Sequence, residues 1–255
     1  MSVWLRAINR VLNGAHVQLR QLPQGHHADA FEEQRRVLAR RKVQVVFDVG
    51  ANVGVTAKRY AGLFPEAQIH CFEPFPDSHD ALTRAFPSSQ RVHAHAVALS
   101  AEVGTRTFYV NKASVTNSLF PTSETYRERH ARSDITTTTG SITVPTTTLD
   151  EFCSQHGIEH IDVLKLDIQG GELLALRGAE RLLRASAIDV IYSEVTFSPI
   201  YEGQAFFHDL APLLFERGYH LYNLYPLTYT RNGLASWTDA LWISRSIERA
   251  LPAVQ

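Results

Sequence analysis

From residue 43 onward, short runs rich in apolar residues alternate with stretches whose apolar residues recur at helical spacing. Short apolar runs bounded by turn residues are typical of strands buried in a sheet. The pattern predicts such strands at 43–49, 68–73, 91–99, 161–167 and 188–194. It predicts helices at 54–63, 76–86, 149–156, 172–183 and 206–217. Strands joined by helices in this way form parallel sheets with right-handed crossovers, so we expect an α/β protein.

Two parts of this region depart from the alternation. Residues 105–110 predict an extra strand, but the sequence from 111 to 142 is polar and shows no periodicity. A long connection without its own elements is usually functional, so we expect an irregular loop at the functional site. Near the end, 219–225 and 240–244 predict two strands. Asn232-Gly233 between them is a hairpin signal, so this last pair is expected to be antiparallel.

The first 42 residues have a different character. Apolar residues recur at helical spacing over 3–12, with arginines between them, and 29–41 predicts a second helix. We interpret 1–42 as a helical extension that covers the sheet or contacts a second copy of the chain in a homodimer. A helix lying on a membrane surface through 3–12 is the alternative. The predicted domain therefore spans 43–245 and is followed by a tail at 246–255.

Composition restricts the class of protein further. The chain has 255 residues, with 25 Lys and Arg against 26 Asp and Glu. A balanced charge argues against a nucleic-acid partner held mainly through its phosphates. Cys71 and Cys153 form no disulfide framework and no metal-binding spacing. The sequence contains no apolar run long enough to span a membrane and no signal-peptide pattern, so we expect a cytoplasmic protein.

Acidic residues stand at the carboxyl ends of four of the predicted parallel strands. These are Asp48, Glu73, Asp167 and Glu194. In open α/β sheets, ligands bind beyond this edge of the sheet. Because carboxylates crowded on one edge repel each other, we expect cationic or hydrogen-bonding groups to meet them there.

The turn after the first predicted strand indicates the ligand. It runs from Asp48 to Gly54, contains Gly50, and leads into a helix whose free N–H groups can bind a carboxylate. It lacks the glycine fingerprint of dinucleotide enzymes, which disfavours oxidoreduction with a nicotinamide cofactor. Glu73, at the end of the next strand, can accept bonds from both ribose hydroxyls. A nucleoside without pyrophosphate, such as S-adenosylmethionine, fits these features, with Asp48 facing its ammonium or sulfonium charge.

Several short motifs together resemble the FkbM family of S-adenosylmethionine-dependent methyltransferases, over nearly all of residues 43–245. The matching segments are 47–54 (FDVGANVG), 72–74 (FEP), 97–100 (VALS), 117–119 (NSL), 148–150 (TLD), 164–172 (LKLDIQGGE) and 239–241 (DAL). Gln169 stands where this family often has glutamate. Residues 1–42 fall outside the resemblance.

The resemblance implies a Rossmann-like class I methyltransferase fold. This is a seven-stranded, mostly parallel sheet with an antiparallel last strand and helices on both faces. It implies methyl transfer to a hydroxyl of a sugar, a glycolipid or a related natural product. Combined with the strand-end argument, it assigns cofactor binding to Asp48, Gly50, Asn52, Gly54, Glu73, Pro74, Ala98, Asn117 and Ser118.

Methyl transfer to a hydroxyl needs a group that removes its proton. Asp167 is the first candidate base, and Glu194 could share that role or orient the acceptor. By strand alternation Lys165 shares a sheet face with Asp167, where it would bind the acceptor or neutralise carboxylates. The resemblance suggests that Glu172 contacts the substrate.

Two questions stay open at this level. A magnesium site built from Asp167, Glu172 and Glu194 is chemically reasonable, but the pattern does not require one, so we predict no metal. The alternative functions are methyl transfer to an amine or peptide, and a catalytically inactive scaffold that binds a nucleoside.

Overall fold

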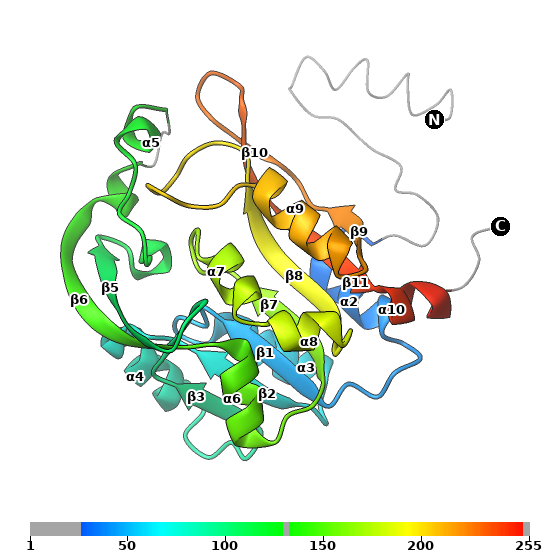
Figure 1. Cartoon of the computed structure of the whole chain (residues 1–255). Helices are drawn as coiled ribbons and strands as arrows, with labels where there is room; N and C mark the ends of the chain where they lie inside the picture. Colours follow the sequence, from blue (N-terminus) through cyan, green and yellow to red (C-terminus); the bar gives the residue numbers. More distant parts are fainter. Residues whose placement is uncertain (1–26, 130–132, 252–255) are drawn as a thin grey trace, which may run out of the picture.

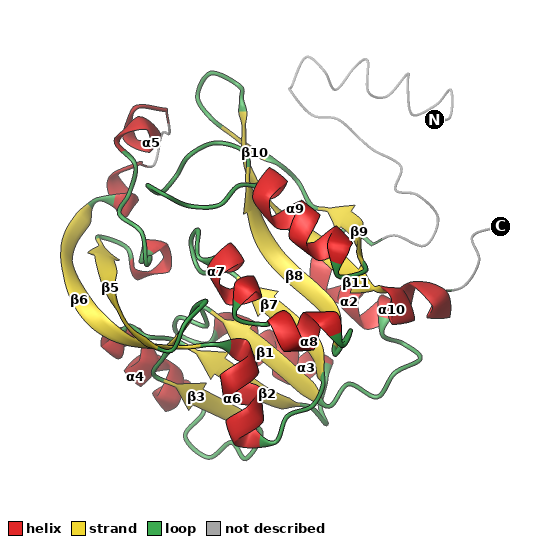
Figure 2. Cartoon of the chain, viewed as in Figure 1, coloured by secondary structure: helices red, strands yellow, loops and turns green. Residues whose placement is uncertain are grey.

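Two sheets of different size organise the chain (Figures 1 and 2). The computed structural model describes residues 27–129 and 133–251, so the predicted helix at 3–12 lies outside the described residues. The main sheet is eight-stranded, in the order β10-β11-β8-β7-β1-β2-β3, with β9 pairing to β11. Its strands are β1 (Val45–Val49), β2 (Gln68–Phe72), β3 (Val92–His95), β7 (Ile161–Leu166), β8 (Ile188–Thr196), β9 (Tyr219–Leu224), β10 (Thr228–Tyr229) and β11 (Ala235–Ser244).

The central strands are parallel, as predicted. β1 lies between β2 and β7, and β8 follows β7 in the same direction. The register places Asp48 of β1 beside Lys165 of β7. Every residue of β7 is buried, because helices cover both faces of the sheet. The carboxyl ends of these strands therefore meet at one edge.

The end of the chain confirms the antiparallel pairing. β11 inserts between β8 and β9 and runs antiparallel to both. Asn232-Gly233 turns the chain between β10 and β11, and Gly233 takes the left-handed φ of +81° that such turns need. The short strand β10 adds an eighth member to the seven strands expected, and β11 begins five residues earlier than expected.

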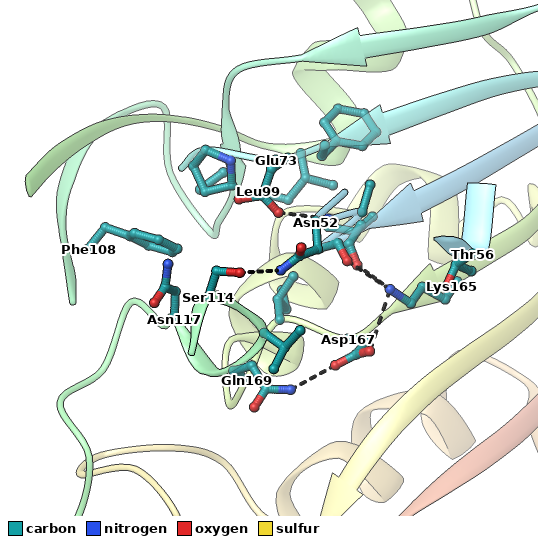
Figure 3. Close-up of a pocket in the computed structure, with 18 of the residues that line it drawn as sticks. Asn52, Thr56, Glu73, Leu99, Phe108, Ser114, Asn117, Lys165, Asp167 and Gln169 are labelled. Carbon is teal, nitrogen blue, oxygen red and sulfur yellow. Dashed lines mark hydrogen bonds and ion pairs between the residues drawn. The ribbon is translucent and has the colours of Figure 1, made fainter. Parts of the chain in front are cut away.

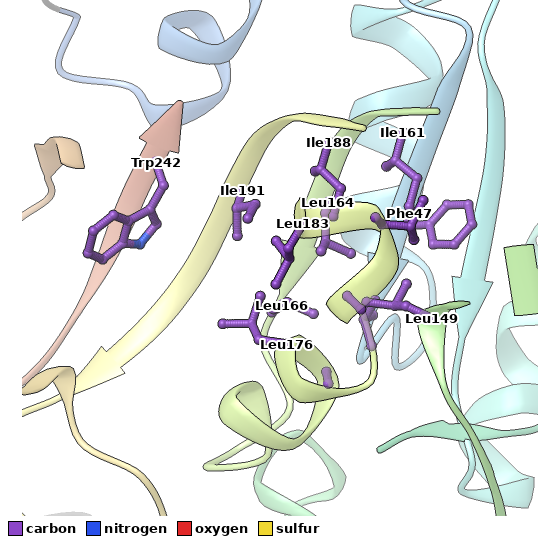
Figure 4. Packing of buried hydrophobic residues seen from close by; sticks show 14 of the residues in the cluster. Phe47, Leu149, Ile161, Leu164, Leu166, Leu176, Leu183, Ile188, Ile191 and Trp242 are labelled. Atoms are coloured by element: carbon purple, nitrogen blue, oxygen red, sulfur yellow. The ribbon is translucent and has the colours of Figure 1, made fainter. Parts of the chain in front are cut away.

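Helices pack on both faces of the main sheet. The helices are α2 (Ala30–Val37), α3 (Val55–Leu63), α4 (Pro76–Ala85), α6 (Leu149–His156), α7 (Glu172–Arg177), α8 (Glu180–Arg184), α9 (Phe207–Glu216) and α10 (Arg245–Ala250). Strand alternation sends Phe47 into a core with α6 to α9, and sends Val46 into a second core with α2, α3, α4 and α10. Figure 4 shows part of the first core, in which Leu183 lies near Ile191 and Leu164, and Leu176 lies near Leu166.

The helix predicted over 172–183 is divided into α7 and α8. Between them, Gly178 approaches Ser100 so closely that an added Cβ would lie 2.2 Å from its carbonyl oxygen. The carboxylate of Asp150 in α6 then accepts the backbone N–H groups of Arg181 and Leu182. These two bonds satisfy N–H groups at the start of α8 that have no partner within the helix.

The segment expected to be irregular is partly a second sheet. β6 (Thr138–Thr147) pairs antiparallel with β5 (Gly104–Asn111) and parallel with β4 (Ala98–Leu99), so the strand expected at 91–99 divides between the two sheets. Threonine is β-branched and suits a strand with exposed positions, although it gives no apolar signal. Among its described residues, the remaining connection contains the short helices η2 (Ser114–Thr116), α5 (Glu124–Arg129) and η3 (Ser133–Thr136).

The second helix expected before residue 43 is α2, and it packs on the main sheet. α2 packs in the same core as α3, where the Tyr60 hydroxyl donates to Gln34 at 2.9 Å. The carboxylate of Asp29 accepts backbone N–H groups at the start of α2. Within the described residues, every helix is too short or too polar to cross a membrane.

Candidate active site

A cavity of about 210 Å³ opens at the carboxyl ends of β1, β2 and β7 (Figure 3). Two carboxylates, Glu73 and Asp167, are among the residues that line it. Of the predicted site residues, the cavity brings together Gly50, Asn52, Glu73, Pro74, Ala98, Asn117, Lys165 and Asp167. The cavity therefore lies at the edge that the strand-end acids predicted.

The turn after β1 forms the floor of the cavity, and its glycines have different roles. Gly50 has a φ of +76°, and a Cβ added there would lie 2.0 Å from the carbonyl oxygen of Asp167. This position therefore requires glycine. Gly54 does not line the cavity, contrary to expectation. It caps α3 with a φ of +89°, and an added Cβ would meet Leu82 and Phe86 at 2.8 Å.

Glu73 is held with both carboxylate oxygens at the cavity. Its Oε2 accepts the N–H of Asn52 at 2.9 Å, and its Oε1 accepts the N–H of Phe75 at 2.9 Å. Burial raises the pKa of this carboxyl, while the two backbone bonds favour its charged form. Each oxygen keeps a lone pair for a further donor. A fixed carboxylate of this kind can bind two adjacent hydroxyl groups.

Next to Glu73 the wall of the cavity is apolar. Its side chains come from the end of β2, from β4 and the residue before it, from β5 and from the segment after β5. They are Phe72, Val97, Ala98, Leu99, Phe108 and Leu119. Such a wall suits a flat, weakly polar group such as a purine ring. Phe108 had no sequence signal, because its place depends on how β5 folds back over the edge of the main sheet.

Lys165 lines the cavity, and its ammonium is held by the turn after β1 and by two carboxylates. Its ammonium lies 3.0 Å from Asp48 Oδ1 and 3.6 Å from Asp167 Oδ2, and it donates to the carbonyl oxygens of Val49 and Gly50 at 3.2 and 3.0 Å. Burial disfavours the charge, but Asp48 and then Asp167 outweigh it and hold the pKa of Lys165 above its usual range. Of the two roles considered for Lys165, neutralising carboxylates fits these contacts.

Asp48, which was expected to face a ligand's positive charge, does not line the cavity. Its side chain is fully buried on the sheet face that it shares with Lys165. Burial raises the pKa of Asp48, and the Lys165 ammonium opposes that shift. The pair therefore supports the turn from beneath.

Asp167 and Glu194 end neighbouring strands but differ in access. The side chain of Asp167 lines the cavity and is 47% exposed. Glu194 does not line the cavity. Burial, followed by the negative charges of Asp167 and Glu172, raises the pKa of Glu194. Asp167 is thus the better placed of the two to meet an acceptor.

Glu172 does not reach the cavity either. Its Oε1 accepts the N–H of Ile168 at 2.9 Å and so closes the turn between β7 and α7. Burial raises the pKa of Glu172 to about 7. Among the described residues, His160, Asp162 and Asp189 place their possible ligand atoms within 4.8 Å of one another, at the amino-terminal ends of β7 and β8. Asp167, Glu172 and Glu194 do not form a group with this spacing.

The segment after β5 covers the turn after β1. The Asn52 side chain, whose backbone φ is +46°, donates to the Ser114 hydroxyl at 3.3 Å. Asn117 lines the cavity, and its Oδ1 accepts the N–H of Asn111 at 2.8 Å. Ser118 lies outside the lining, and its hydroxyl donates to the backbone oxygen of Gln169 at 2.6 Å. The sequence assigned no role to Ser114 or Gln169, both of which line the cavity.

Comparison with known proteins gives a family. A model of the Methyltransferase FkbM domain matches residues 48–221. The 2-O-methyltransferase NoeI of Sinorhizobium fredii is 30% identical over 168 residues, which are 63% of this chain and 66% of NoeI. The hexuronic acid methyltransferase AglP of Haloferax volcanii is 28% identical over 141 residues, 55% of this chain and 52% of AglP. The chain thus spans about half to two thirds of the length of these relatives.

Among solved structures, that of magnesium protoporphyrin IX methyltransferase from Synechocystis aligns with this one at a TM-score of 0.44 and 11% sequence identity. The alignment covers 96% of this chain and 98% of the Synechocystis chain. The family match covers more than half of the 255 residues and includes both the turn after β1 and the turn after β7. The chain therefore belongs to the FkbM family of methyltransferases.

Proposed function

We propose that this chain transfers the methyl group of S-adenosylmethionine to a hydroxyl group of a sugar. The observation that carries the proposal is the pairing, in one cavity, of a fixed carboxylate, Glu73, with a second, accessible carboxylate, Asp167. NoeI is a 2-O-methyltransferase and AglP a hexuronic acid methyltransferase, which favours a sugar acceptor.

The residues of the cavity fit S-adenosylmethionine. The two oxygens of Glu73 suit the ribose hydroxyls, and the apolar wall that includes Phe72 and Phe108 suits adenine. Gly50 lets the turn after β1 pack directly against the backbone of Asp167, which brings the turn and the end of β7 together at the cavity. The first turn of α3, with Thr56 at the cavity, has the free N–H groups that favour a ligand carboxylate.

Asp167 would act as the base. When bound, S-adenosylmethionine supplies an electrophilic methyl group: the acceptor oxygen forms the O–CH3 bond as the S–CH3 bond breaks, and the electron pair of that bond stays on sulfur. Asp167 accepts the hydroxyl proton as the oxygen becomes bonded to carbon. Holding the acceptor oxygen near attack distance supplies much of the remaining rate enhancement. Lys165, which contacts both Asp167 and the turn after β1, keeps the base and the cavity floor in fixed relation.

Calorimetry tests the cofactor half of the proposal. Glu73→Ala removes two acceptors for charged hydrogen bonds, so S-adenosylmethionine should bind about 10- to 100-fold more weakly. Glu102→Ala, which removes an exposed carboxylate outside the cavity, is the matched control and should bind as the wild type does. Equal affinity of Glu73→Ala and wild type would overturn the placement of the ribose.

An acceptor panel tests the substrate half. Hexuronic acids, neutral sugars, amines and peptides are each incubated with the protein and methyl-labelled S-adenosylmethionine, and products are identified by mass spectrometry. We expect methylation of sugar hydroxyls. Label found only on amines or peptides would replace the proposal with the alternative acceptor class, and binding without turnover on any acceptor would indicate the inactive scaffold.

A further inference from the structure

Asn117 carries a buried hydrogen-bond donor at the cavity. Its side chain lines the cavity, yet the residue is only 8% exposed. Its Oδ1 accepts the N–H of Asn111 at 2.8 Å, which settles which end of the amide is oxygen and which is nitrogen. Among the residues that the structure describes, none accepts a hydrogen bond from its Nδ2. Because a buried N–H without a partner costs free energy, this donor needs an acceptor from a ligand.

Hydrogen bonds hold the Asn117 amide in this orientation. Asn111, whose N–H binds the amide oxygen, ends β5 and is itself buried, and its own Oδ1 accepts the hydroxyl of Thr138 in β6 at 2.9 Å. The next residue, Ser118, exchanges two backbone hydrogen bonds with Tyr109 of β5, at 2.8 and 3.2 Å. Turning the amide over would break the bond to Asn111. The free N–H groups are therefore fixed in place before a ligand binds, which lowers the entropic cost of using them.

The place of Asn117 in the cavity indicates which part of the cofactor it faces. Figure 3 shows Asn117 and Phe108 together, at the end of the cavity away from Thr56 and Lys165. The proposed function places the cofactor's carboxylate at the α3 turn that contains Thr56 and its ribose hydroxyls at Glu73. The adenine then lies at the end of the cavity that Phe108 and Asn117 line.

Adenine offers acceptors that an amide N–H can recognise. Its ring nitrogens N1, N3 and N7 each carry a lone pair in the plane of the ring, whereas its exocyclic amino group is a donor. The wall around Asn117 is otherwise apolar, because Ala98, Phe108 and Leu119 form one small core cluster. In such pockets a few polar groups fix the orientation of a ligand and decide which ligand binds. A lone amide donor in this wall suits a ring nitrogen.

We propose that Asn117 selects the base of the cofactor: its Nδ2 donates a hydrogen bond to a ring nitrogen of adenine. The inference rests on the proposed function, which supplies S-adenosylmethionine as the cofactor and places its ribose at Glu73. Binding gives the buried N–H its partner. A heterocycle without a lone pair at that point leaves the donor unsatisfied, which is how a buried polar group discriminates between ligands of the same shape. The bond thus adds specificity for adenine to the affinity that the apolar wall supplies.

Calorimetry with S-adenosylhomocysteine, the demethylated cofactor, tests the bond. The compound is compared with its 1-deaza, 3-deaza and 7-deaza analogues, in each of which a C–H group replaces one ring nitrogen. For each analogue the measured quantity is its penalty, the ratio of its dissociation constant to that of the parent compound. With the wild type, the analogue that lacks the nitrogen bound by Asn117 should have a penalty of about 10-fold, because the buried N–H loses its acceptor.

Two variants of Asn117 remove the donor in different ways. Asn117→Asp, measured at about pH 8 so that the carboxyl is ionised, keeps the size of the side chain and an oxygen for the Asn111 N–H. Asn117→Leu keeps the size and removes every polar atom. In both variants the penalty of that one analogue should fall to about 1-fold, while the other two penalties stay as in the wild type. Asn232→Asp makes the same chemical change at an exposed position outside the cavity and should keep all three penalties.

The outcomes distinguish this inference from the proposed function. If the wild type binds neither S-adenosylmethionine nor S-adenosylhomocysteine, the proposed function fails first and the role of Asn117 fails with it. If the wild type binds both and the three penalties are the same in the wild type and in both Asn117 variants, the role of Asn117 is wrong while the function stands. A lower Tm with unchanged penalties would mark a purely structural role, and a raised KM for the sugar with unchanged penalties would place Asn117 at the acceptor; either result overturns the inference. Loss of a single penalty in both variants, with Asn232→Asp unchanged, supports it.

Discussion

Replacing Lys165 with methionine removes the cation that neutralises Asp48 beneath the cavity. The Asp48 carboxylate is fully buried, and the Lys165 ammonium lies 3.0 Å from its Oδ1. Removing one member of a buried ion pair leaves the other charge uncompensated, which costs about 3–5 kcal/mol of unfolding free energy. The carbonyl oxygens of Val49 and Gly50 lose the same donor, which adds to that cost. For a chain of this size the expected fall in Tm is about 6–20 °C.

Thermal and urea unfolding of matched variants measure this effect. Lys42→Met serves as the control, because Lys42 is 67% exposed and pairs with Glu66 at the surface, where ion pairs contribute little. The double variant Asp48→Asn with Lys165→Met removes the uncompensated charge, so it should recover part of the lost stability. A Tm of Lys165→Met equal to that of Lys42→Met would refute the claim that Lys165 supports the turn by charge.

Two further predictions concern the backbone and pH. Gly50→Ala should destabilise the fold and abolish S-adenosylmethionine binding in calorimetry, because its Cβ would lie 2.0 Å from the Asp167 carbonyl oxygen. The control is Gly62→Ala in α3, whose Cβ would have no atom within 4 Å, so it should keep both the stability and the binding of the wild type. Wild-type affinity in Gly50→Ala would contradict the close approach. Asp189 raises the pKa of His160 through a hydrogen bond, so the stability that this pair adds is complete below about pH 6 and is lost as pH rises through the raised pKa. The Tm difference between wild type and His160→Gln should therefore shrink as the pH is raised from about 5.5 to about 8.5. A Tm difference that stays constant over this range would be evidence against the ion pair.

The central sheet was predictable because its strands carry a strong apolar signal. β7 and β8 are buried almost throughout, so the sequence shows them as continuous apolar runs. Helices on both faces and short connections then restrict the topology to a parallel sheet. Glu73 and Asp167 were found for the same reason, since a residue at the end of a parallel strand must lie at the ligand edge.

The missed features depend on contacts between distant segments. Asp48 was expected to face the ligand, but its side chain is buried on the face of the sheet where Lys165 lies beside it. Glu172 was expected to contact substrate, but the turn after β7 uses its carboxylate for the Ile168 N–H. β6 was missed because threonine and other small or polar residues dominate it and give no apolar pattern. Phe108 was missed because only the pairing of β5 with β6 positions it at the cavity. These positions follow from tertiary packing and not from local spacing.

The most direct test of the account is transfer of a labelled methyl group from S-adenosylmethionine to a sugar hydroxyl, compared between wild type and Asp167→Asn. Asparagine matches aspartate in size but cannot accept the hydroxyl proton, so kcat should fall about 10²- to 10⁴-fold. Calorimetry should show that Asp167→Asn still binds S-adenosylmethionine, because Glu73 and the apolar wall are unchanged. Wild-type turnover in Asp167→Asn would contradict the account, and so would the absence of methylated hydroxyl product with the wild type.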